Sequence, residues 1–182
     1  MTIRDELLFG RPPKLKVFIS SEMRSKNLED ERLAAADAVE EGRFHFAWYW
    51  ERDANAGPFS SEVVCLGQAR TSDCLILILG ETLTPITRSE YFQAQEAGAS
   101  CFIFTKVRCT RDPEAEAFLV QERQHAIYKN FETAGDLRSA ILDALLTHAV
   151  QAARRDQMAR HAALAEQRAR RPLAWMRRGI RG

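Results

Sequence analysis

Residues 74–79 read Cys-Leu-Ile-Leu-Ile-Leu and are followed by Gly80. This apolar run has the length of a β-strand and carries no polar residue at either alternate position. Such a strand is covered on both faces, which is typical of parallel sheets packed between helices. The run therefore predicts a fully buried strand of an α/β protein.

Strand and helix patterns alternate on both sides of this run. Further strands are expected at 15–20, 44–51 and 100–107, and helices at 28–41, 60–71, 87–98, 114–129 and 136–154. Right-handed crossovers would bring the carboxyl ends of the strands to one edge, where ligands bind in such sheets. We expect a lead-in over 1–13, ending at a Pro-Pro pair, and an α/β domain over 14–150.

The composition is that of a soluble globular protein, with 46% hydrophobic and 28% charged residues. The apolar runs are far shorter than the roughly 20 residues of a membrane-spanning helix. Residues 1–10 lack a signal-peptide pattern, so we expect a cytoplasmic protein. Neither the four histidines nor the cysteines have metal-site spacing, and we expect free thiols at Cys65, Cys74, Cys101 and Cys109.

Charge is distributed unevenly along the chain. Residues 151–182 contain nine arginines and two acidic residues, whereas residues 1–150 contain 17 basic and 23 acidic residues. The segment 151–182 is expected to be a basic tail, helical or disordered, whose helix would end at Pro172. A solvated arm, a subunit contact, an anionic partner such as a membrane surface or nucleic acid, and a link to another module all remain open for this tail.

Polar residues or glycine follow several of the expected strands. Ser20 and Ser21 end the first, Trp50 lies at the end of the second, and Gly80 follows the third. Helices begin near this edge, and helix N-termini favour anions such as phosphate. The glycine-rich motifs of dehydrogenases and P-loop nucleotidases and the G-x-S-x-G motif are missing from the sequence, which argues against those three classes.

Four short stretches occur in order over residues 15–107: Val-Phe-Ile-Ser-Ser-Glu-Met-Arg at 17–24, Leu-Glu-Asp-Glu-Arg at 28–32, Ser-Asp-Cys-Leu-Ile-Leu-Ile-Leu-Gly at 72–80 and Ser-Glu-Tyr at 89–91. Together they resemble a bacterial TIR-like family, which is related to Toll/interleukin-receptor domains and to nucleoside deoxyribosyltransferases. The resemblance implies a flavodoxin-like, three-layer α/β fold with a parallel sheet of four or five strands.

The same resemblance implies a site. Catalytic relatives use a glutamate on the helix after the third strand to cleave an N-glycosidic bond, and Glu90 holds that position. NAD or a related nucleotide would be the substrate, with no separate cofactor, and the role would be in prokaryotic immune defence. The residues implied to bind substrate are Ser20, Ser21, Arg24, Trp50, Gly80 and Ser89.

Two segments bear on this reading. Many relatives carry an aromatic-glycine pair at residues 81–85, and this sequence does not. The difference affects the expected floor of the pocket and the expected substrate preference. The loop 52–60 corresponds to the loop that gates the pocket and makes domain contacts in Toll-type domains. We therefore expect this loop to be mobile or to take part in self-association.

A carboxylate suits this chemistry because cleavage develops positive charge at the anomeric carbon. The nicotinamide of NAD is already a cationic leaving group, so no general acid is required. A neutral leaving base would need a proton donor, and none of the four histidines stands at a position in the sequence that indicates this role.

Structural interpretations compete with these roles. Glu90 in a first helical turn would be favoured by the helix dipole, Trp48 and Trp50 would pack in the core, and Arg32 would pair back along its own helix. The alternative function is a non-catalytic TIR-like module for interaction or nucleotide sensing.

Overall fold

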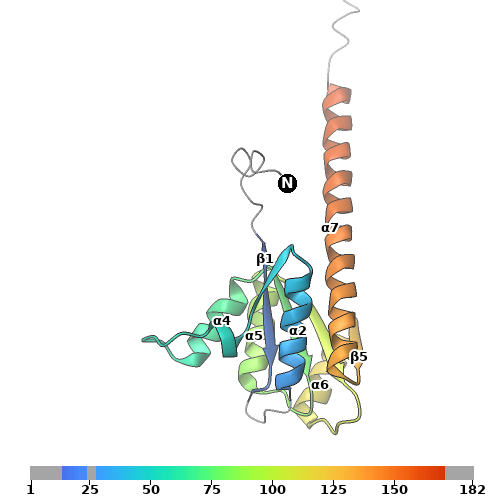
Figure 1. Cartoon of the computed structure of the whole chain (residues 1–182). Helices are drawn as coiled ribbons and strands as arrows, with labels where there is room; N and C mark the ends of the chain where they lie inside the picture. The colour runs from blue at the N-terminus through green and yellow to red at the C-terminus, as the bar shows by residue number, and fades with distance from the viewer. Residues whose placement is uncertain (1–13, 24–27, 171–182) are drawn as a thin grey trace, which may run out of the picture. The chain divides into compact units, whose positions relative to one another are not determined.

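The computed structural model describes residues 14–23 and 28–170. Five strands form one sheet in the order β2-β1-β3-β4-β5, and every neighbouring pair is parallel (Figure 1). The strands are β1 (Leu15–Ser21), β2 (His45–Trp48), β3 (Cys74–Leu79), β4 (Ser100–Lys106) and β5 (Tyr128–Phe131). This order is that of the flavodoxin-like doubly wound fold, so the predicted fold class is confirmed.

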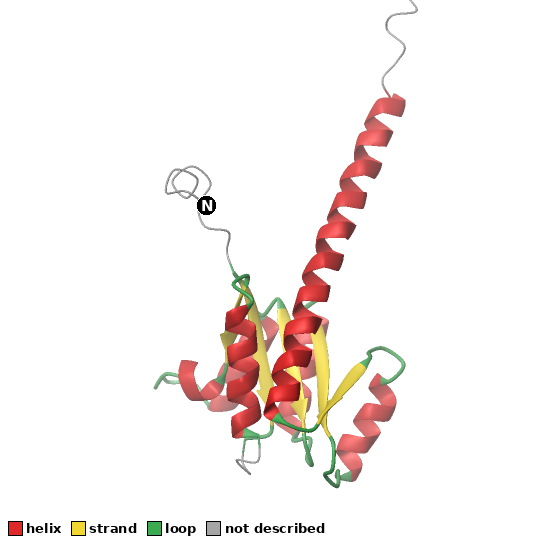
Figure 2. Cartoon of the chain, turned by 45° about the vertical axis from the view of Figure 1, so that its right-hand side comes forward, coloured by secondary structure: helices red, strands yellow, loops and turns green. Residues whose placement is uncertain are grey.

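Within residues 14–23 and 28–170, six helices connect or follow these strands (Figure 2). They are α2 (Glu29–Glu41), α3 (Trp50–Asp53), α4 (Ser61–Arg70), α5 (Pro85–Glu96), α6 (Pro113–Glu122) and α7 (Ala134–Arg170). In the described part of the chain, none of the helices combines the length and apolar character needed to cross a membrane.

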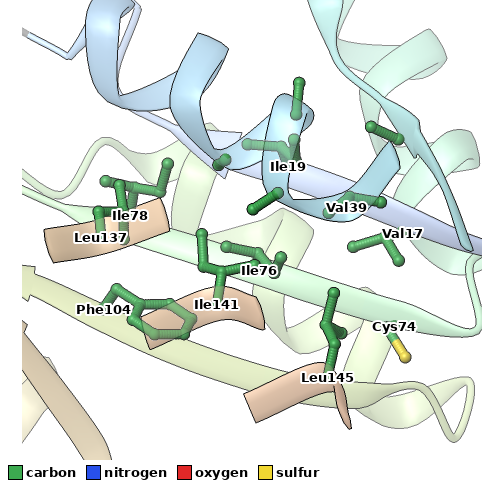
Figure 3. Packing of buried hydrophobic residues seen from close by; sticks show 14 of the residues in the cluster. Val17, Ile19, Val39, Cys74, Ile76, Ile78, Phe104, Leu137, Ile141 and Leu145 are labelled. Atoms are coloured by element: carbon green, nitrogen blue, oxygen red, sulfur yellow. The ribbon is translucent and has the colours of Figure 1, made fainter. Parts of the chain in front are cut away.

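The central strand β3 divides its side chains between two cores. Cys74, Ile76 and Ile78 pack with α2 and the first turns of α7 (Figure 3). The alternate side chains Leu75, Leu77 and Leu79 pack with α4, α5 and α6. The unbroken apolar run therefore serves both faces of the sheet, as the sequence predicted.

The chain divides into two units, residues 1–145 and 146–182. In the first unit Leu137, Ile141 and Leu145 of α7 are buried in the core. In the second unit, the side chains of residues 150–169 are exposed. One helix runs without interruption from Ala134 to Arg170, so the helix expected over 136–154 and the start of the basic tail form one element.

Three predicted boundaries are corrected by the structure. Strand β2 ends at Trp48 rather than Glu51, and Trp50 begins the short helix α3. Trp48 is buried and stacks on Phe18 with 5.2 Å between ring centroids, which confirms its core role. Helix α5 begins at Pro85, capped by Thr84, and not at Thr87.

The third correction adds a strand. The helix expected over 114–129 ends at Glu122, whose carbonyl oxygen accepts hydrogen bonds from the backbone of His125 and Ala126. Residues 128–131 then pair with β4 as the edge strand β5, and Phe131 is buried. Packing of this aromatic ring outweighs the helical pattern of the preceding segment.

Candidate active site

A cavity of about 720 Å³ lies at the carboxyl edge of the sheet, next to the end of β1. The N-terminal ends of α4, α5 and α6 contribute to it, together with α3. Its walls are formed by Ser21, Met23, Trp50, Ser61, Glu62, Cys65, Thr82, Leu83, Thr84, Pro85, Ile86, Thr87, Glu90 and Glu114. This is the edge where ligands of doubly wound folds bind.

Glu90 occupies a core-facing position of α5. Thr87, Glu90, Tyr91 and Ala94 follow the i, i+3, i+4, i+7 spacing of one helix face, and all four are buried. Because α5 begins at Pro85, Glu90 lies in the second helical turn and not in the first. Only 5% of its surface is exposed, so the helix dipole does not explain its placement.

The Glu90 carboxylate accepts hydrogen bonds from two elements. Ser20 faces the α5 side of the sheet, because side chains alternate along β1, and its hydroxyl donates to Glu90 Oε2 at 2.5 Å. The Cys65 thiol on α4 donates to the same carboxylate. Burial raises the pKa of Glu90 to about 7, and the two hydrogen bonds oppose this rise.

Cys65 was not expected at the site from the sequence. Burial, followed by the charge of Glu90, raises the pKa of its thiol to about 12. The group is thus a neutral hydrogen-bond donor rather than a nucleophile. The signal available in the sequence was its apolar neighbourhood, which is equally typical of an inert buried cysteine.

Arg32 supports the other side of the cavity. Its side chain is buried, and one guanidinium nitrogen donates to the Ser21 hydroxyl at 3.0 Å and to the Glu22 carbonyl oxygen at 3.1 Å. Two other nitrogens contact Glu51 on α3 at 2.6 Å. Arg32 therefore joins α2, the end of β1 and α3, and the prediction that it pairs along its own helix is wrong.

The remaining four predicted binding residues have four different positions. Trp50 is half-buried and lines the cavity, as Ser21 does. Ser89 is exposed, donates to the Pro85 carbonyl oxygen and lies outside this cavity. Gly80 borders a second cavity of about 370 Å³ instead, and Arg24 lies outside the described residues.

Gly80 has a packing role. A Cβ atom at this position would lie 3.3 Å from a methyl carbon of Leu28, the residue before α2. A glycine therefore allows the turn after β3 to pass close to the start of α2.

The chemistry available at the cavity centres on one carboxylate. In the described residues, no group of three or more histidine, cysteine or acidic side chains is arranged to hold a metal ion. Glu90 has a pKa of about 7 and is held by Ser20 and Cys65. Its side chain can therefore stabilise a developing cation as a carboxylate or hold a proton as an acid.

Comparison with known proteins finds one family model, described as "Domain of unknown function (DUF4062)", which matches residues 16–146. No curated protein matches the sequence. The chain is similar in structure to the CMP N-glycosidase BcmB of Clostridium botulinum, with a TM-score of 0.51 and 14% identity, over 69% of this chain and 96% of that one.

Two more distant structures share the general α/β arrangement. One is that of the TIR domains of the activated Roq1 resistosome, with a TM-score of 0.43 and 14% identity, over 71% of this chain and 82% of that one. The other is a flavodoxin from the domain Archaea, with a TM-score of 0.41 and 10% identity, over 71% and 95%. At these identities the likenesses concern the fold.

Proposed function

The chain belongs to the DUF4062 family, and we propose that it cleaves the N-glycosidic bond of NAD or a related nucleoside or nucleotide. Glu90 is the catalytic carboxylate in this proposal. The observation that carries it is the buried Glu90 side chain in the wall of the 720 Å³ cavity, held by a hydroxyl and a thiol. Burying a carboxylate without a paired cation costs stability, which is characteristic of functional sites.

The reaction proceeds by heterolysis of the bond between the anomeric carbon and the base nitrogen. The bonding electron pair leaves with the base, and positive charge develops on the ribose. The Glu90 carboxylate stabilises this charge, and a water molecule then adds to the anomeric carbon. The proton lost by this water passes to Glu90 and then to solvent, so the carboxylate is regenerated.

The hydrogen bonds to Glu90 fit this role. Ser20 and Cys65 both donate to the carboxylate, so they fix its orientation without supplying positive charge. The full charge of the ionised side chain therefore remains available for the ribose. Support for this reaction class also comes from the CMP N-glycosidase, whose chain is covered over 96% of its length.

The test is release of nicotinamide from NAD or nicotinamide riboside by the purified full chain, with Glu90→Gln as the diagnostic variant. We expect turnover by the wild type and a loss of at least about 100-fold in Glu90→Gln, which corresponds to about 2.7 kcal/mol of barrier. Glu96→Gln on the same helix is the matched control, because Glu96 is exposed and does not line the cavity.

Turnover that survives Glu90→Gln removes this residue from the mechanism. Nucleotide binding without turnover by the wild type favours a sensing or interaction module instead.

Self-association through the loop after α3 belongs to the same proposal, and the 69% exposed Phe59 in that loop supports it.

A further inference from the structure

The cavity has a marked imbalance of charge. Glu62, Glu90 and Glu114 all line it, and no lysine or arginine does so among the described residues. Glu62 and Glu114 are exposed at the mouth, whereas Glu90 is buried. An ionised ligand group inside this cavity therefore meets a field that favours positive charge and repels phosphate.

Three helix N-termini face the cavity, and such termini usually favour anions. Here their own side chains already serve them. The N-cap residues Ser60, Thr84 and Asp112 each accept a hydrogen bond from the backbone of their helix. Glu62 and Glu114 add carboxylates to the first turns of α4 and α6. An incoming phosphate would have to compete with all of these groups.

Two arginines of the described chain that contact or adjoin lining residues, Arg32 and Arg88, have other partners. Arg32 lies behind Ser21 and contacts Glu51 at 2.6 Å. Arg88 on α5 lies over the Phe92 ring and borders a different cavity. Neither one lines the cavity that contains Glu90.

An aromatic wall completes the arrangement. Trp50 lines the cavity together with the apolar side chains of Leu83 and Ile86. An indole ring attracts cations through its negative face and stacks on planar heterocycles. Carboxylates combined with an indole form the environment that recognises a flat cationic ring.

Resting on the proposed function, we propose that the substrate is a riboside of a cationic heteroaromatic base, bound with no phosphate group inside the cavity. Nicotinamide riboside and N7-methylated purine ribosides belong to this chemical class. The glycosidic bond breaks with its electron pair passing to the ring nitrogen, so the base leaves neutral. Water supplies the hydroxyl group of the ribose product and one proton is released. No proton donor to the base is required, so Glu90 can act in its carboxylate form.

Binding tests this proposal without relying on turnover. The probe is 1-methylnicotinamide, and its neutral carbon isostere 3-methylbenzamide is the matched ligand control. Calorimetric titration of the full chain at low ionic strength should give a dissociation constant at least about tenfold lower for the cation. This preference should shrink as salt is added, because Glu62 and Glu114 are exposed. Equal or weaker binding of the cation, including no binding of either probe, overturns the proposal.

Charge variants assign the preference to the cavity. The double substitution Glu62→Gln and Glu114→Gln should reduce the cation preference by about threefold or more, whereas Glu96→Gln should leave it unchanged. An unchanged preference in the double variant overturns the proposed electrostatic origin. Glu90→Gln serves the separate question of catalysis, since selective cation binding without any Glu90-dependent turnover contradicts the proposed function and leaves this inference intact.

Turnover gives the second readout. The ratio of kcat/KM for nicotinamide riboside to that for nicotinamide mononucleotide should exceed about tenfold, because the two differ only in a phosphate group. A higher kcat/KM for the mononucleotide contradicts the exclusion of phosphate even if both substrates are cleaved.

Discussion

Arg32 on α2 and Glu51 on α3 form a contact in which two guanidinium nitrogens lie 2.6 Å from one carboxylate oxygen. The Arg32 side chain is 5% exposed, and that of Glu51 is 33% exposed. The third nitrogen of the guanidinium reaches the end of β1 through Ser21 and Glu22. One side chain thus fixes two walls of the cavity relative to each other.

We expect Arg32→Lys to destabilise the fold by about 2–4 kcal/mol, because an ammonium group cannot reproduce the fork that serves three partners. Urea unfolding measures this loss. Arg138→Lys is the matched control, since Arg138 pairs with Glu41 at the surface and the same substitution should cost less than about 1 kcal/mol. Equal losses for the two variants would mean that Arg32 contributes no more than a surface ion pair.

Cys65 provides a test of how Glu90 is held. Cys65→Ala removes one of the two side-chain donors to the carboxylate, so the pKa of Glu90 should rise further above 7. If the carboxylate form is the active one, the pH at which turnover is half-maximal should move upward by on the order of half a pH unit.

Cys65→Ser retains a donor and should restore the original profile. Cys74→Ala, a similar substitution of a buried thiol in the opposite core, serves as the control. A pH profile that is identical in all variants would show that Cys65 does not influence the reacting group.

Sequence reasoning reached the fold through patterns that are local. The apolar run of β3 and its alternation with helices follow from periodicity alone, and both are confirmed. Strand β5 was missed because it has four residues, two of them exposed and polar, and no glycine or proline separates it from α6. Its strand character comes from pairing with β4, which a single segment does not reveal.

The residues of the site could be predicted only in part from the sequence, for a related reason. Ser20 and Glu90 are 70 residues apart, and their contact depends on the face of β1 that α5 covers. The buried stripe of α5 did contain a visible signal, because a glutamate stands among Thr87, Tyr91 and Ala94 at core-facing spacing. The reach of Arg32 to Glu51 left no comparable pattern, since it depends on the path of the chain after β2.

Truncation of the basic tail tests whether the first unit folds alone. A chain ending at residue 150 keeps Leu137, Ile141 and Leu145, the side chains through which the start of α7 packs into the core. Because residues 151–169 are exposed, we expect the melting temperature to change by less than about 4 °C. Binding to anionic vesicles or to DNA should weaken with the loss of the arginines.

Ile141→Ala in the full chain is the destabilising control for this experiment. Ile141 is fully buried, and its truncation should cost about 2–5 kcal/mol. An insoluble or unfolded product from the truncated chain would contradict the proposed boundary, because it would place necessary packing in residues 151–182.

The substitution Glu90→Gln should change both turnover and the pH dependence of the unfolding free energy. The pKa of Glu90 is about 7 in the folded chain against an ordinary value of 4.5. Below pH 4.5 both states hold the proton, so the carboxyl group carries no charge penalty. Between 4.5 and 7 the unfolded chain releases the proton first, and the folded state loses stability as the pH rises. Above 7 the penalty is complete, on the order of 3 kcal/mol.

The glutamine variant escapes this penalty, although its amide group adds two donors that need partners in a buried position. The Ser20 hydroxyl can still donate to the amide oxygen. We therefore expect Glu90→Gln to be about 2 kcal/mol more stable than the wild type at pH 8 and nearly equal to it at pH 4.5, while turnover falls by at least about 100-fold. Urea unfolding at the two pH values measures the difference, with Glu96→Gln expected to match the wild type at both. If the stability difference between Glu90→Gln and the wild type is the same at pH 4.5 and pH 8, Glu90 has the same pKa in the folded and the unfolded chain. Charging Glu90 would then cost the fold no stability, and no such cost could be attributed to catalysis.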